Sequence, residues 1–240
     1  MTRVPAADNT LRILDFLSSQ RGPVPAAMVA TALGLPRSSA YQLLTVMAER
    51  GYVTHVPEEK RFGLGPAAYA LASSYARQQP LTRLGAPLIA KLVDRLGESA
   101  HMAVLHSTDV LYLVEERARN RPSLITDVGV RLPATKTASG RAMLARLPAA
   151  QLRAEYPESK EYAAVKRLLE PVRRDGYATE DGDVTEGLAS VAVAVVDHAG
   201  WPAAAVAVTY PRTEYEDAHR LIDAVESVAL ELGRRIHGHG

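Results

Sequence analysis

The chain reads LGLPRSSAYQLL from Leu33 to Leu44, a glycine-containing turn followed by the start of a helix. Apolar side chains on this helix recur at i, i+3, i+4 and i+7, the spacing of one buried face: Ala40, Leu43, Leu44 and Met47. The apolar pattern before the turn predicts a helix that begins near Pro25 and buries Met28, Val29, Ala32 and Leu33. Two helices joined in this way predict a helix-turn-helix, whose second helix normally enters the major groove of DNA.

The opposite face of the second helix is polar, with groups that can donate hydrogen bonds, accept them or stack on bases. The N-terminal residues of a recognition helix lead into the groove, so this face suits base edges. The residues predicted to contact DNA from it are Arg37, Ser38, Ser39, Tyr41, Gln42 and Thr45.

A further helix is expected before this pair. It begins behind a cap at Asp8 or Asn9 and is ended by Gly22 and Pro23. Its predicted buried residues are Leu11, Ile13, Leu14 and Leu17. The first segment of the chain is therefore expected to hold three short helices.

A hairpin is expected after the recognition helix. Residues 52–56 alternate like a strand, residues 57–60 form a turn and residues 61–64 return. This arrangement predicts a wing, with Lys60 and Arg61 placed to meet phosphate. A helical fragment with a hairpin that packs against another domain is the structural alternative.

The charge balance gives little support for tight DNA binding by one copy. The formal net charge of the whole chain is +1, and residues 1–64 carry seven basic and five acidic side chains, a balance of +2. Because phosphate neutralisation drives much of DNA affinity, a weakly basic reader gains from presenting two copies to a symmetric site. We therefore expect a homo-oligomer, a dimer or a tetramer, on a palindromic double-stranded operator.

Beyond residue 65 the pattern changes to a mixed α+β domain. The alanine-rich stretch 66–79 predicts a linker helix, which can also contribute a dimer contact. Further helices are expected at residues 81–96, 137–145, 149–155, 162–175 and 214–236, and strands at residues 100–105, 110–115, 123–128, 189–196 and 203–209. The short connections between strands predict an antiparallel sheet.

Composition restricts the location and the chemistry. The 240 residues include no cysteine, which excludes thiolate metal sites and cysteine nucleophiles and fits a reducing cytoplasm. The first nine residues lack a signal peptide, and no apolar run approaches the roughly 20 residues of a membrane helix. We therefore expect a cytoplasmic protein with no membrane partner. His237 and His239, in the glycine-rich tail, are expected to have no metal role.

The usual signatures of catalysis are missing from the sequence. It contains no nucleophile elbow, no phosphate-binding loop and no zinc-protease motif. Glu98 and His101 are separated by a predicted change from helix to strand, and Glu115 and Glu116 point to opposite faces of a strand. We expect no catalytic residue, no metal and no cofactor. An unrecognised enzyme, or a ligand-binding adaptor whose first domain contacts protein, is the alternative.

The order of these signals resembles the isocitrate lyase regulator (IclR) family of bacterial transcription factors. Two segments of the reader carry the likeness, residues 33–44 and RFGLG at residues 61–65. Two longer segments lie in the second domain, RLPATKTASGRAMLA from Arg131 and GYATEDGDVTEGLASVA from Gly176. Family members often have a cysteine near the strand position held here by Ser190, which leaves the effector's identity open.

The resemblance implies a winged helix-turn-helix at residues 1–65, a linker helix at residues 66–80 and a GAF-like effector-binding and oligomerisation domain at residues 81–240. It also implies a transcriptional regulator, more often a repressor, controlled by a small carboxylated or aromatic metabolite. The residues expected to bind that effector are Thr137, Ala138, Ser139, Gly140, Asp181, Asp183, Ser190, Ala207 and Thr209.

The residues give this pocket a physical basis. Thr137 can cap the helix that starts there, and the small residues after it let a ligand approach free backbone amides, which favour an anion. Asp181 and Asp183 are equally well explained as turn formers, and a carboxylate ligand would be repelled by them.

Overall fold

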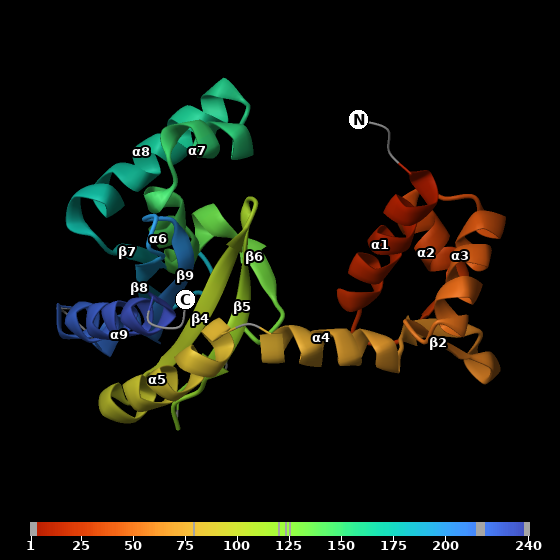
Figure 1. Cartoon of the computed structure of the whole chain (residues 1–240), viewed down its shortest axis with the longest axis horizontal. Coiled ribbons are helices and arrows are strands. Elements are labelled where there is room, and N and C mark those ends of the chain that lie inside the picture. Colours follow the sequence, from red (N-terminus) through yellow and green to blue (C-terminus); the bar gives the residue numbers. More distant parts are fainter. Residues whose placement is uncertain are drawn as a thin grey trace. The chain divides into compact units, whose positions relative to one another are not determined.

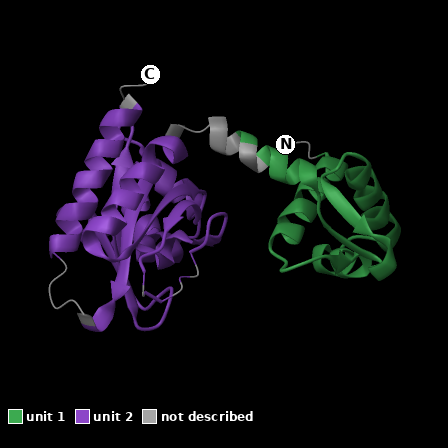
Figure 2. Cartoon of the chain, turned by 90° about the horizontal axis from the view of Figure 1, so that it is seen from below, with its two compact units in different colours: residues 1–78 green, residues 79–240 purple. Residues whose placement is uncertain are grey.

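The computed structural model describes residues 4–78, 80–119, 121–122, 124, 126–214 and 219–237. The chain forms two compact units, residues 1–78 and residues 79–240 (Figure 2). None of the described helices combines the length and apolar character needed to cross a lipid bilayer.

The first unit consists of helices around a small sheet (Figure 1). Its elements are α1 (Pro5–Ser18), β1 (Val24–Pro25), α2 (Ala26–Leu33), α3 (Arg37–Glu49), β2 (Val53–Val56), the 3-10 turn η1 (Pro57–Glu59), β3 (Arg61–Leu64) and α4 (Pro66–Gln78). The antiparallel sheet has the order β1-β3-β2. Gly34 ends α2 in the left-handed conformation, which glycine adopts at no steric cost. The predicted helix-turn-helix and wing are therefore confirmed as folded elements.

Several details of this unit differ from the sequence prediction. α1 begins at Pro5 without a side-chain cap, because proline at the first helical position already has the required φ. Leu11 is 63% exposed and Met28 is 48% exposed, and Ala32 is exposed as well. Ile13 and Leu17 set the buried face of α1, and Leu11 lies two positions, about 200°, away from Ile13 on the helix.

The second unit is a six-stranded antiparallel sheet with helices on both faces (Figure 1). Its helices are α5 (Pro80–Leu96), α6 (Ala138–Arg146), α7 (Ala149–Glu155), α8 (Ser159–Asp175) and α9 (His219–His237), with 3-10 turns η2 (Ala134–Lys136) and η3 (Arg212–Glu214). The strands are β4 (Ser99–His106), β5 (Asp109–Glu116), β6 (Arg131–Pro133), β7 (Ala178–Asp181), β8 (Leu188–Val196) and β9 (Pro202–Pro211), in the order β6-β5-β4-β9-β8-β7.

Alternate side chains of strand β8 belong to the two hydrophobic cores on opposite faces of the sheet. Val191, Val193 and Val195 pack in the cluster that contains α5 and α9. Ala192 and Ala194 alternate with them and pack in the cluster that contains α6 and α8. Small side chains on that face let α6 approach the sheet closely, which brings the start of α6 over the strands.

The predicted α+β class with an antiparallel sheet is confirmed, and the strand predicted at residues 123–128 is wrong over its described residues. Residues 124 and 126–128 are not in a strand, and the strand at that edge of the sheet is β6, which follows the turn at Gly129 (φ 87°). β7 was not predicted. The final helix begins at His219, residues 215–218 lie outside the described chain, and so does His239.

Candidate functional site

The exposed face of α3 carries most of the residues predicted to read DNA. Ala40, Leu44 and Met47 are buried in the core of the first unit. The predicted contact residues Arg37, Ser38, Tyr41, Gln42 and Thr45 are exposed, and Ser39 is half-buried. α3 therefore presents a largely polar surface, bordered by the exposed Val46.

Two of these side chains are already oriented by the protein. The Tyr41 ring meets the Phe62 ring edge to face, with 5.9 Å between centroids. The Thr45 hydroxyl donates to the Tyr41 carbonyl at 2.9 Å, so it can only accept a hydrogen bond from DNA. Gln42 keeps both halves of its amide available within the described part of the first unit, which suits bidentate contact with adenine.

The two predicted phosphate contacts of the wing, Lys60 and Arg61, differ in their surroundings. Lys60 occupies the left-handed conformation (φ 52°) at the tip of the hairpin and is exposed. Arg61 donates from Nη1 to the Pro23 carbonyl at 3.1 Å and lies 3.7 Å from a carboxylate oxygen of Glu59. Lys60 is thus the freer phosphate contact, and the charge of Arg61 is partly balanced within the wing.

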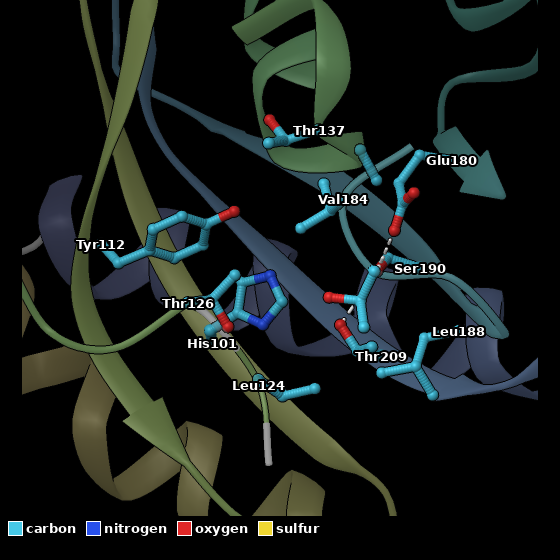
Figure 3. Close-up of a pocket in the computed structure, with 12 residues that line it drawn as sticks. His101, Tyr112, Leu124, Thr126, Thr137, Glu180, Val184, Leu188, Ser190 and Thr209 are labelled. Atoms are coloured by element: carbon cyan, nitrogen blue, oxygen red, sulfur yellow. Dashed lines mark hydrogen bonds between the residues drawn. The ribbon is translucent and has the colours of Figure 1, made fainter. Parts of the chain in front are cut away.

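A narrow cavity lies at the start of α6 in the second unit (Figure 3). About 330 Å³ of space free of atoms lies between its walls, open solvent included, with room for the centre of little more than one water molecule. Its lining consists of His101, Tyr112, Leu124, Thr126, Thr137, Ala138, Glu180, Val184, Thr185, Leu188, Ser190 and Thr209. Strands β4, β5, β7, β8 and β9 and the N-terminus of α6 all contribute to it.

The N-terminus of α6 is held by local contacts. The Thr137 hydroxyl accepts from the Gly140 N–H at 2.9 Å, which caps the helix. Gly140 packs against the turn before it, and a Cβ there would lie 2.2 Å from the Ala134 carbonyl oxygen. The predicted cap is confirmed, and glycine at residue 140 is required by backbone contact.

A hydrogen-bonded chain forms one wall of the cavity. The Ser190 hydroxyl donates to Glu180 Oε1 at 2.7 Å and lies 2.9 Å from the Thr209 hydroxyl. The Asp183 N–H donates to Glu180 Oε2 at 3.1 Å. Burial raises the pKa of Glu180, and these donated hydrogen bonds act in the opposite direction. The buried carboxyl group is therefore the polar centre of this wall.

The facing wall holds His101 and Tyr112, whose rings meet edge to face at 5.0 Å. Burial lowers the pKa of His101 to about 4, so the imidazole is neutral near pH 7. Among the described residues that line the cavity, His101 Nδ1 and Thr126 Oγ1 are buried with no hydrogen-bond partner. Unpaired buried polar atoms are costly, so these two are available to a bound molecule.

His101 should also make stability depend on pH. Between its ordinary value of 6.5 and its folded value of about 4, the unfolded chain binds a proton that the folded unit does not. We expect the second unit to lose about 2 kcal/mol of stability between about pH 7 and about pH 5 from this group. Denaturant unfolding of His101→Gln, which cannot titrate here, should show a smaller loss. The raised pKa of Glu180 makes stability rise as the pH falls, and it does so equally in the unaltered protein and in His101→Gln. Equal changes of the free energy of unfolding with pH in the two proteins would refute the assignment to His101.

The predicted effector residues divide into two groups. Thr137, Ala138, Ser190 and Thr209 line the cavity, and the other five do not. Asp181 is exposed beside Arg212, Asp183 pairs with Arg141, and Ser139, Gly140 and Ala207 are buried outside the lining. The position of Asp181 outside the cavity follows from strand β7, in which successive side chains alternate between the two faces. Glu180 therefore points inward and Asp181 points outward.

The sequence reasoning missed the lining residues His101, Tyr112, Leu124, Thr126, Glu180, Val184, Thr185 and Leu188. Alternation along the two predicted strands could have placed His101 and Tyr112 on the α6 face. Glu98 does not share their site, since it pairs with Arg121. Among the described residues, no group of three His, Asp or Glu side chains could hold a metal ion.

The fold of the first unit and the exposed face of α3 define a class of protein, the winged helix-turn-helix DNA-binding proteins. In this chain a second unit with a cavity follows. The sequence model of the bacterial transcriptional regulator IclR C-terminal domain matches residues 73–234, and the IclR helix-turn-helix domain matches residues 6–57. The chain belongs to the IclR family of bacterial transcriptional regulators, which confirms the resemblance and the function as a DNA-binding regulator.

Relatives match along nearly the whole chain. The transcriptional repressor IclR of Escherichia coli K12 is 25% identical over 96% of this chain and 91% of its own length. The Pca regulon regulatory protein of Pseudomonas putida is 27% identical over 83% of this chain and 72% of its own length. Both relatives are named as regulators.

Solved structures share the fold. An IclR regulator from Alicyclobacillus acidocaldarius has a TM-score of 0.82 at 21% identity, covering 97% of this chain and 99% of that one. An IclR homologue from Microbacterium hydrocarbonoxydans, solved in complex with 4-hydroxybenzoate, has a TM-score of 0.80 at 20% identity, covering 95% and 98%.

Proposed function

We propose that this protein is a transcriptional repressor whose DNA binding is controlled by a small molecule bound in the cavity at the start of α6. The observation that carries the proposal is a built polar cavity with two unpartnered buried polar atoms, in a chain that also carries a DNA-reading helix. The repressor IclR and the homologue that binds 4-hydroxybenzoate support it by analogy. We expect the protein to act in the cytoplasm.

The domain assignment is part of this proposal. Residues 1–65 would read DNA, residues 66–80 would link, and residues 81–240 would bind the effector and form oligomers. Tyr69 is 78% exposed and Leu71 is 56% exposed on α4, which supports a contact between copies there. The small charge of the reader supports the proposal of a dimer or tetramer on a palindromic operator.

Control requires the effector to bind one arrangement of the oligomer better than another. A coupling of about 1–3 kcal/mol corresponds to roughly a 5- to 150-fold change in operator affinity. The test is fluorescence anisotropy on a duplex selected from a randomised pool, with and without compounds that bind the second unit. A saturating compound that leaves operator affinity unchanged would refute the sensor role.

The two kinds of DNA contact make different predictions. Gln42→Ala should weaken operator binding by about 1–3 kcal/mol and leave binding to random DNA little changed, because bidentate pairing reads a base. Lys60→Ala should weaken both similarly, because a phosphate contact carries no sequence information. Anisotropy titrations on both duplexes compare the two variants. Equal losses on operator and random DNA for Gln42→Ala would remove it from the base-reading set.

A further inference from the structure

The cavity at the start of α6 is narrower than a metabolite. Its free space has room for the centre of little more than one water molecule, so a ligand of several heavy atoms enters only if part of the lining moves. The lining strands β4, β5, β8 and β9 each pair with a neighbour on both sides, which holds them in the sheet. A movable part is therefore expected at the rim of the cavity.

The loop between β7 and β8, residues 182–187, forms part of this rim. Val184 and Thr185 line the cavity, and Figure 3 shows the Val184 side chain among the other lining residues. The remaining four residues of the loop are exposed, so little packing opposes its movement. Gly182 and Gly187 stand at its two ends with φ of 74° and 80°, and glycine changes φ with the least steric cost.

One ion pair ties this loop to α6. Nη2 of the half-buried Arg141 pairs with the Asp183 carboxylate. The same guanidinium donates from Nε to the Thr135 carbonyl at 2.8 Å and from Nη1 to the Thr179 carbonyl at 2.7 Å. Because these two bonds fix the planar guanidinium, its third contact holds the loop at a defined position beside the turn before α6.

A second contact links the loop to the inside of the cavity. The Asp183 N–H donates to Glu180 Oε2 at 3.1 Å, and Glu180 Oε1 accepts from the Ser190 hydroxyl at 2.7 Å. The buried carboxyl group therefore joins the loop to the cavity wall. A bound molecule that contacts Glu180 acts on the position of the loop as well.

We propose that residues 182–187 are a lid over the cavity and that the ion pair between Arg141 and Asp183 is its latch. Rotation about the two end glycines carries Val184 and Thr185 out of the lining, and closure restores the ion pair. Arg141 is a positioning residue, because it holds the lid without lining the cavity. Since the lid admits and retains an effector, this inference rests on the proposed effector role of the cavity.

Modification of His101 by diethylpyrocarbonate measures how often the cavity of the full-length protein opens. His101 is 3% exposed, and near pH 7 its imidazole is neutral, which is the form that reacts. The reagent is larger than the free space of the cavity, so reaction requires opening. The exposed His106 and His198 are internal references in the same molecules. Mass spectrometry after brief labelling gives the rate at each histidine.

Asp183→Ala should raise the modification rate of His101 about 5-fold relative to the references, because the closed state loses a partly exposed ion pair. Asp183→Asn removes the charge and keeps one acceptor oxygen, so it should give a smaller increase, and it decides if Asp183→Ala fails to fold. Glu186→Ala is the matched control. Glu186 is exposed on the same loop outside the lining, and its loss should leave the rate unchanged.

Hydrogen exchange separates lid opening from a general loss of stability. In both Asp183 variants, exchange should rise over residues 182–187 and stay unchanged in peptides of α9. Faster exchange in α9 as well would overturn the assignment of the latch.

An unchanged rate at His101 in both Asp183 variants would overturn the lid and place the opening elsewhere, as in the segment of Leu124 and Thr126. It would leave the effector role standing, because the reagent is not an effector. The effector role fails on a different result, an operator affinity that a saturating compound leaves unchanged.

Discussion

Gly140→Ala destabilises the second unit by about 3 kcal/mol, because overpacking against fixed backbone forces the chain to move. A Cβ at residue 140 would lie 2.2 Å from the Ala134 carbonyl oxygen and 2.4 Å from the Ala134 Cα. No flexible side chain can yield there. The shift would displace Thr137 and Ala138, so ligand binding should be lost along with stability.

Hydrogen exchange of peptides from residues 80–237 measures the change in that unit. Gly233→Ala, in α9, is the matched control, since its Cβ would meet no atom of a neighbouring element closer than the Val196 carbonyl oxygen at 3.8 Å. Replacing a helical glycine by alanine there should stabilise the unit by about 0.5–1 kcal/mol. Similar exchange rates in both variants would contradict the close packing of α6 on η2.

Leu44→Ala should unfold much of the DNA-reading unit, with a cost of about 2–5 kcal/mol for a fully buried leucine. Leu44 is 0% exposed and lies in a small cluster with Ile13, Met47 and Phe62. The same substitution at Leu11, which is 63% exposed, should change stability by less than about 0.5 kcal/mol.

The readouts for this pair are hydrogen exchange of peptides from residues 4–64 and anisotropy on operator DNA. Leu44→Ala should raise exchange in those peptides and abolish specific binding, while peptides from residues 80–237 stay protected. Equal effects of Leu44→Ala and Leu11→Ala would contradict the assignment of the buried face of the reader.

The reader could be predicted largely from local pattern. The apolar spacing of α3 fixes which residues face the core, so its polar face follows directly. The wing follows from two short strands around Pro57 and Lys60. The exposure of Leu11 and Met28 could not be predicted as readily, because short helices present a narrow buried stripe to a small core.

The lining of the cavity was harder to predict from the sequence, because strands that are far apart in the sequence contribute to it. β4 pairs with β9 in the middle of the sheet, which brings His101 and Thr209 into one site although they lie far apart in the sequence. The short strand β7 ends with Glu180 and Asp181 and is followed by Gly182, residue types that are depleted in strands, so its inward carboxyl group was not predicted. The cap at Thr137 was predicted because capping depends on local sequence alone.

Selection of bound sequences from a randomised duplex pool, with the full-length protein near physiological salt, tests sequence-specific DNA recognition by this protein. We expect enrichment of a palindromic motif by the unaltered protein, and a relaxed preference at one base of each half-site in Gln42→Ala. Folded protein that enriches no motif, with and without the compounds that bind its second unit, would contradict a sequence-specific regulator.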